Sequence, residues 1–143
     1  LHTDIPQGES STMKKIATLC CTLLLTASFT APVLAANPVK TDMKAMSQSL
    51  RAASQADDAA GMKAALTKLR EYSVHAKGQI PPDFKDQPAD GPERKAYVEG
   101  LDTLIKQIDD TIGLLDAGKL DEAKAALDGM TQTKREYHKK LKV

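Results

Sequence analysis

Two residues near opposite ends of the chain have side chains that could bind one metal ion together. His138 lies in the basic stretch KREYHKKLKV at the C-terminus, and Met43 lies in DMKAMSQSL. A thioether with an imidazole is a poor zinc site, because zinc favours more nitrogen or thiolate ligands, and a poor calcium site, because calcium binds oxygen. The pair does match the two axial ligands of an iron held in a planar macrocycle.

Each residue also has a simpler interpretation. Methionine is a flexible residue that fills gaps in helical cores. A histidine flanked by lysines near a terminus is commonly a solvated surface residue. Residue types and spacing by themselves leave these interpretations open for both Met43 and His138.

The remaining polar residues indicate no catalytic centre. His75 is expected at the surface, because no second metal-binding residue has a suitable spacing from it. The adjacent Asp109 and Asp110 lie about 100° apart around a helix and cannot form a carboxylate pair on one face. The sequence contains no P-loop, dinucleotide fingerprint or nucleophile–base arrangement, so we do not expect an enzyme.

The N-terminal region is typical of an exported protein. From Met13 the sequence MKKIATLCCTLLLTASFTAPVLAAN has two lysines, an apolar stretch and small residues before a cleavage point after Ala35. A membrane anchor is the alternative, but threonines and a proline interrupt the stretch and no basic cluster follows it. We expect residues 1–12 to be an upstream extension, 13–35 a signal peptide, and 36–143 a single domain in the periplasm.

The sequence from Ala36 onward predicts an all-α fold. Helical periodicity runs through four segments, and no segment alternates as a strand does. The second ends at Gly78, and Pro92 begins the third after the proline-rich loop 79–91. Short turns join the other segments, which favours an up-down-up-down antiparallel four-helix bundle. The inward stripes are Val39, Met43, Met46, Leu50, Ala53; Met62, Leu66, Leu69, Ala76; Tyr97, Leu101, Leu104, Ile105, Ile108, Ile112, Leu115; and Leu120, Ala123, Leu127, Met130, Lys134, His138, Leu141.

This topology predicts that the two candidate ligands meet. The first helix begins at the end of the bundle where the fourth helix ends, so Met43 and His138 lie at similar depths. The same end receives the loop with Pro81 and Pro82. A thioether facing an imidazole across an apolar slot fits the axial ligands of a six-coordinate heme iron. The sequence lacks C-x-x-C-H, so such a heme would be bound non-covalently, as b-type heme is.

Composition narrows the function classes further. The formal net charge is +1, so the chain lacks the large excess of positive charge that is typical of proteins that bind nucleic acid or an anionic membrane. Both cysteines, Cys20 and Cys21, lie in the expected signal peptide, so we expect no disulfide in the mature domain. Aromatic residues make up 3% of the chain, which indicates an aliphatic, methionine-rich core.

Residues 36–142 resemble the cytochrome b562 family of soluble periplasmic proteins. Five stretches carry the resemblance, in order and with matching spacing: DMKAMSQSL, ADDAAGMKAALTKLR, IPPDFKD, GLDTLIKQIDD and KREYHKKLK. Cytochrome b562 is itself an up-down-up-down four-helix bundle. The resemblance implies one non-covalent heme b per chain, with Met43 and His138 as its axial ligands. The other residues that it implies near the heme are Met46, Pro81, Pro82, Tyr97, Leu101 and Lys134.

Three of these residues depart from the family pattern. Tyr97 and Leu101 stand where the family commonly has phenylalanines against the heme, and Lys134 stands where an arginine is expected near the heme edge. Tyr97 adds a hydroxyl group that needs a partner or solvent, and Leu101 removes an aromatic wall. These changes bear on heme affinity and redox potential rather than on ligation.

The resemblance implies electron transfer rather than catalysis. With both axial positions filled by protein, no coordination site is open to a substrate. We expect a monomer that exchanges electrons with redox partner proteins whose identity the sequence does not give, and that binds neither nucleic acid nor, once the signal is cleaved, a membrane. The alternative is a heme-free periplasmic bundle with a binding or stress function, which the bundle pattern alone supports.

Overall fold

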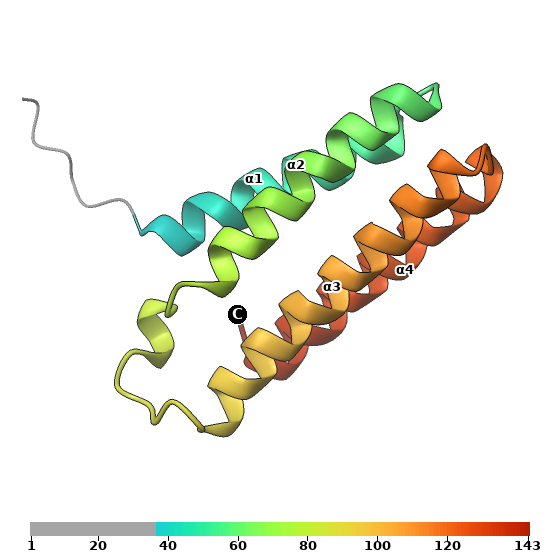
Figure 1. Cartoon of the computed structure of the whole chain (residues 1–143). Helices are drawn as coiled ribbons and strands as arrows, with labels where there is room; N and C mark the ends of the chain where they lie inside the picture. The colour runs from blue at the N-terminus through green and yellow to red at the C-terminus, as the bar shows by residue number, and fades with distance from the viewer. Residues whose placement is uncertain (1–36) are drawn as a thin grey trace, which may run out of the picture. The chain divides into compact units, whose positions relative to one another are not determined.

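The computed structural model describes residues 37–143. The expected upstream extension, the expected signal peptide and Ala36 therefore lie outside the described residues. The described part contains α1 (Pro38–Gln55), α2 (Ala59–Lys77), the short 3₁₀ helix η1 (Pro82–Phe84), α3 (Pro92–Asp116) and α4 (Leu120–Leu141). It contains no strand, and the predicted antiparallel four-helix bundle is confirmed (Figure 1).

The helix ends follow local sequence signals. The side-chain oxygen of Asn37 accepts a hydrogen bond from the amide of Lys40 at the start of α1. Asp58 caps α2, because its Oδ1 accepts a hydrogen bond from the amide of Gly61 at 2.7 Å. Each cap satisfies a backbone donor that the first turn of a helix leaves free.

A glycine closes α3 and turns the chain into α4. Gly118 has a φ of +76°, in the left-handed region that costs a residue with a Cβ atom. Its amide donates to the carbonyl of Leu115, and the amide of Lys119 donates to that of Leu114. These two bonds are the pattern of a Schellman motif, which satisfies the free carbonyls at a helix C-terminus.

The predicted inward stripes form the core, except that Lys134 is exposed and Ile105 is half-buried outside the core cluster. Residues with 0% exposure include Met62, Leu66, Ile108 and Met130. The core also includes Phe84 of η1, a helix that the periodicity of the loop did not predict. None of the helices within residues 37–143 combines the length and hydropathy needed to cross a bilayer.

The four helices pack as two hairpins, α1 with α2 and α3 with α4 (Figure 1). The hairpins are joined along α2 and α3, whereas α1 and α4 contact each other at few places. The α2–α3 seam carries three ion pairs, and successive pairs lie seven residues apart on each helix, so that all three occupy one face. They are Lys63–Asp116, Arg70–Asp109 and Lys77–Asp102.

We predict opposite effects for two glycine substitutions in this part of the fold. Gly118→Ala forces a Cβ atom into the left-handed region and should lower the free energy of unfolding by about 1 kcal/mol. Gly113→Ala, inside α3, has nothing within 4 Å of the new Cβ atom. It should raise the same quantity by about 0.5–1 kcal/mol. Urea unfolding followed by circular dichroism measures both. Equal effects of the two variants would contradict the left-handed turn.

Candidate functional site

A cavity of about 440 Å³ opens at the end of the bundle that holds the loop before α3. All four helices, the loop and the C-terminal residue contribute to its wall, and most of the wall is apolar. A cavity of this size and character is suited to an organic cofactor rather than to a bare ion. All eight residues singled out from the sequence line it: Met43, Met46, Pro81, Pro82, Tyr97, Leu101, Lys134 and His138.

The two candidate ligands come from opposite ends of the described chain. Met43 lies in the second turn of α1 and His138 in the last turns of α4; both are partly buried. Burial of the imidazole, with the nearby charge of Lys134 as a smaller cause, lowers the pKa of His138 below its ordinary value. A lowered pKa favours the neutral ring, which is the form that binds a metal.

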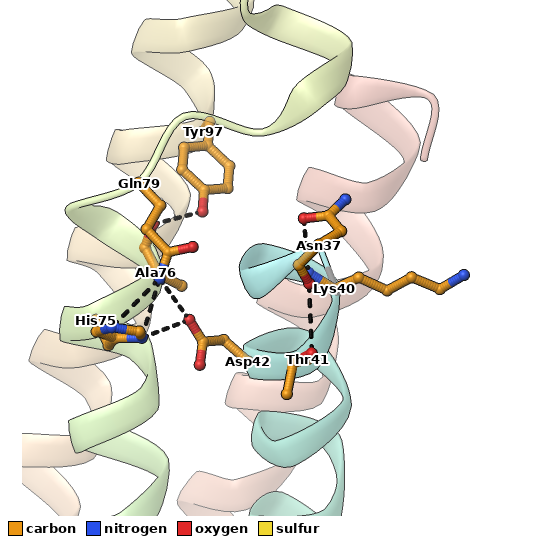
Figure 2. A network of polar contacts seen from close by, with 8 residues as sticks. All are labelled: Asn37, Lys40, Thr41, Asp42, His75, Ala76, Gln79 and Tyr97. Atoms are coloured by element: carbon orange, nitrogen blue, oxygen red, sulfur yellow. Dashed lines mark hydrogen bonds and ion pairs between the residues drawn. The ribbon is translucent and has the colours of Figure 1, made fainter. Parts of the chain in front are cut away.

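Tyr97 has a partner for the hydroxyl group that the sequence left unassigned. The hydroxyl donates to the carbonyl of Ala76 at the end of α2, at 2.7 Å, and the residue is buried (Figure 2). Phe84 of η1 packs edge-on against the Tyr97 ring, with 6.5 Å between the centroids. An aromatic side chain from the loop therefore supports this wall of the cavity, while Leu101 makes the neighbouring wall aliphatic.

Lys134 links α4 to α1, on the side of the bundle where these two helices contact each other at few places. Its ammonium donates to the hydroxyl of Ser47 on α1 at 3.0 Å. Both residues lie on the cavity wall and both are exposed. Lys134 and Ser47 therefore lie at the solvent-exposed rim of the cavity.

Tyr137, the residue before His138, is held in place where α4 closely approaches α3. The Tyr137 ring lies against Gly100 of α3, so closely that a Cβ atom there would come within 2.7 Å of the ring. The ammonium of Lys140 lies 5.3 Å from the centroid of the same ring. Lys140 also pairs with Glu99 of α3. These contacts hold the last turns of α4 against α3 and so fix the position from which His138 extends.

The structure also contains a polar cluster that the sequence did not predict. The buried carboxylate of Asp42, on α1, lies 2.7 Å from Nδ1 of His75 and 2.9 Å from the side-chain nitrogen of Gln79 (Figure 2). The His75 side chain is 66% exposed, as expected for a surface histidine. Its partner was missed because the two residues lie on different helices. The sequence shows only an acidic residue directly before Met43, and its burial becomes evident in the structure.

The other acidic candidates behave as expected. Asp109 pairs with Arg70 on α2, whereas Asp110 pairs with Lys106 on α3 itself. The two carboxylates therefore serve different ion pairs. Within residues 37–143, no group of three or more histidine, cysteine or acidic side chains is arranged to hold a metal ion.

We predict that the buried hydroxyl of Tyr97 makes stability depend on alkaline pH. Desolvation, followed by the charge of Asp42, raises the pKa of Tyr97 to about 12. The unfolded chain loses this proton near pH 10, so the contribution is complete below pH 10 and is lost as the pH rises toward 12. The wild-type advantage over Tyr97→Phe should be about 1 kcal/mol at pH 7. It should fall between pH 10 and 12 in urea unfolding, and an unchanged difference would contradict the raised pKa.

A second prediction concerns the contact between Gly100 and Tyr137. Gly100→Ala should lower the free energy of unfolding by about 1–3 kcal/mol, because the new Cβ atom overlaps the ring. Gly129→Ala on α4 is the matched control, since its nearest new contact is at 3.6 Å. Adding Tyr137→Leu to Gly100→Ala should recover part of the loss in a double-mutant cycle. Additive effects of the two changes would contradict a direct contact.

The sequence is similar to known proteins over most of its length. The sequence model of the cytochrome b562 family matches residues 38–142. The "probable soluble cytochrome b562 2" of Yersinia pestis is 37% identical over 127 residues, which cover 89% of this chain and 96% of the relative. The "probable soluble cytochrome b562 1" of the same organism is 30% identical over 101 residues, covering 71% and 80%. The chain therefore belongs to the cytochrome b562 family, a family of b-type heme proteins.

Proposed function

We propose that this protein carries single electrons on one non-covalently bound heme b, with Met43 and His138 as the axial ligands. The observation that carries the proposal is that a thioether from α1 and an imidazole from α4 line one apolar cavity. We propose further that the protein acts as a monomer in the periplasm after export and exchanges electrons with protein partners.

The donor set and the cavity fit this cofactor. A thioether and a neutral imidazole are the axial pair that gives six-coordinate heme iron its electron-transfer function. The apolar wall, with Met46, Leu101 and Leu104 on it, suits the faces of a macrocycle. Lys134 and Lys40 are exposed cations on the same wall, and they could pair with acidic groups at the edge of a ligand.

Heme supplies an iron that gains or loses one electron. The protein's residues set the conditions for that exchange. The thioether favours the reduced iron and so raises the potential, and an apolar wall disfavours the extra charge of the oxidised state. The contacts of α4 with α3 hold the imidazole, and those of α1 with α2 hold the thioether. Ligands fixed in one arrangement reduce the reorganisation that accompanies each transfer.

The first test is the visible spectrum of the mature domain, purified without heme and then titrated with hemin. We expect a low-spin spectrum after reduction with dithionite, at one heme per chain. Because no covalent bond is formed, acid–acetone should extract the heme. Met43→Leu and His138→Ala should each abolish the low-spin spectrum and weaken hemin binding by more than about tenfold, as expected when a ligand bond is lost.

Met62→Leu is the matched control, because Met62 is fully buried and is not on the cavity wall. Its spectrum should equal that of the wild type. A protein that stays colourless with hemin would contradict the proposal and favour the heme-free bundle. A low-spin spectrum that survives Met43→Leu would contradict the assignment of that ligand.

A further inference from the structure

Asp42 is a buried acid in contact with two donors from the end of α2. Its side chain is 7% exposed. Burial of a carboxylate is costly unless hydrogen bonds compensate for the lost water. Nδ1 of His75 and the side-chain nitrogen of Gln79 both approach the same oxygen, Oδ2, at 2.7 and 2.9 Å. Gln79 Nε2 also lies 2.9 Å from Nδ1, so the three side chains form one cluster, and Nδ1 donates to the carboxylate in the tautomer that carries its hydrogen there.

The partners of Asp42 stand on a firmly held part of the bundle. Ala76, next to His75, accepts hydrogen bonds from the Tyr97 hydroxyl of α3 and from the amide of Gln79. Lys77 forms an ion pair with Asp102 of α3. The end of α2 is therefore fixed to α3, and Asp42 fixes α1 to the end of α2 (Figure 2).

The position of Asp42 in the sequence connects this cluster to Met43. Consecutive residues of a helix point about 100° apart, so a carboxylate that faces α2 lets the next side chain face the cavity. The other side of this part of α1 borders the cavity rather than a tightly packed helix. The rotation of α1 about its own axis is thus set from the α2 side.

We propose that Asp42, His75 and Gln79 form a positioning cluster that fixes the direction of Met43 and thereby strengthens the bond between its thioether and the heme iron. This inference rests on the proposed function, since it assumes that Met43 is a ligand. The members of the cluster contribute no ligand themselves. They act through the rotation and position of the first turns of α1.

Three variants test the cluster. His75→Ala combined with Gln79→Ala removes both donors and leaves the carboxylate buried. Asp42→Leu replaces the carboxylate by an apolar side chain. The variant therefore loses the anchor without leaving an unpaired charge in the core. Asp42→Asn keeps the anchor, since its one side-chain oxygen can still accept from both His75 and Gln79, which approach a single oxygen of Asp42.

The readouts follow the thioether bond. We expect the double variant and Asp42→Leu to show a high-spin fraction in the hemin-loaded protein. After reduction, they should bind carbon monoxide about tenfold faster than the wild type, which is the size of effect typical when a residue that orients a metal ligand is removed. Asp42→Asn should stay close to the wild type in both measurements. The matched control is Arg70→Ala, which breaks an ion pair of the α2–α3 seam without touching α1.

The outcomes separate positioning from general stability. If the double variant and Asp42→Leu unfold more easily than the wild type but keep its spin state and its rate of carbon monoxide binding, the inference is overturned. The same holds if Arg70→Ala changes the spin state as much as they do. Failure of the proposed function is a different result, because the wild-type protein would then show no low-spin heme at all.

A measurement without heme provides a second check. In protein labelled with ¹³C at the methionine methyl groups, the Met43 resonance should move toward the value of a freely rotating side chain in the double variant. The resonance of Met62 should stay unchanged, because that side chain is enclosed in the core. An unchanged Met43 resonance would count against the positioning role whether or not heme binds.

Discussion

The seam between α2 and α3 is the constraint on which the rest of the bundle depends. Its apolar residues are buried, and its three ion pairs repeat every seven residues along both helices. Exposed ion pairs individually add little stability. All three pairs form together only in the observed antiparallel register, because a shift of one helix by seven residues would keep two of them at most. Because this side of the bundle is closed, the α1–α4 side can remain loosely packed and hold a cavity without separating the two hairpins.

Much of this fold could be predicted from the sequence, because helical periodicity, proline at helix starts and glycine at a helix end are local signals. The site residues were also accessible, for a related reason. Met43 and His138 both continue an apolar stripe, and the antiparallel topology brings the start of α1 and the end of α4 together. The resemblance to the cytochrome b562 family, which the comparisons support, added Pro81 and Pro82 as pocket residues, because helical periodicity does not extend into the loop that contains them.

The contacts that could not be predicted all depend on how one helix is rotated against another. The pairing of Asp42 with His75 joins two helices, and no spacing rule within either helix reveals it. The bond from the Tyr97 hydroxyl to Ala76 uses a backbone carbonyl, which has no sequence signature at all. The short helix η1 was not predicted because the contact between Phe84 and Tyr97, rather than the helix propensity of its own residues, accounts for its position. In each case the decisive information is how segments that are separate in the sequence are placed against one another in three dimensions.

The placement of the two candidate ligands also has a consequence for when the site can exist. Met43 belongs to the first helix of the described chain and His138 to the last turns of the final one. The contacts within the hairpin of α1 and α2 join helices that are consecutive in the chain, as do those within the hairpin of α3 and α4, and such local contacts form early in folding. Neither hairpin contains both ligands. The complete pair therefore arises only after α4 has been synthesised and docked, so the site requires both hairpins to be present and packed together.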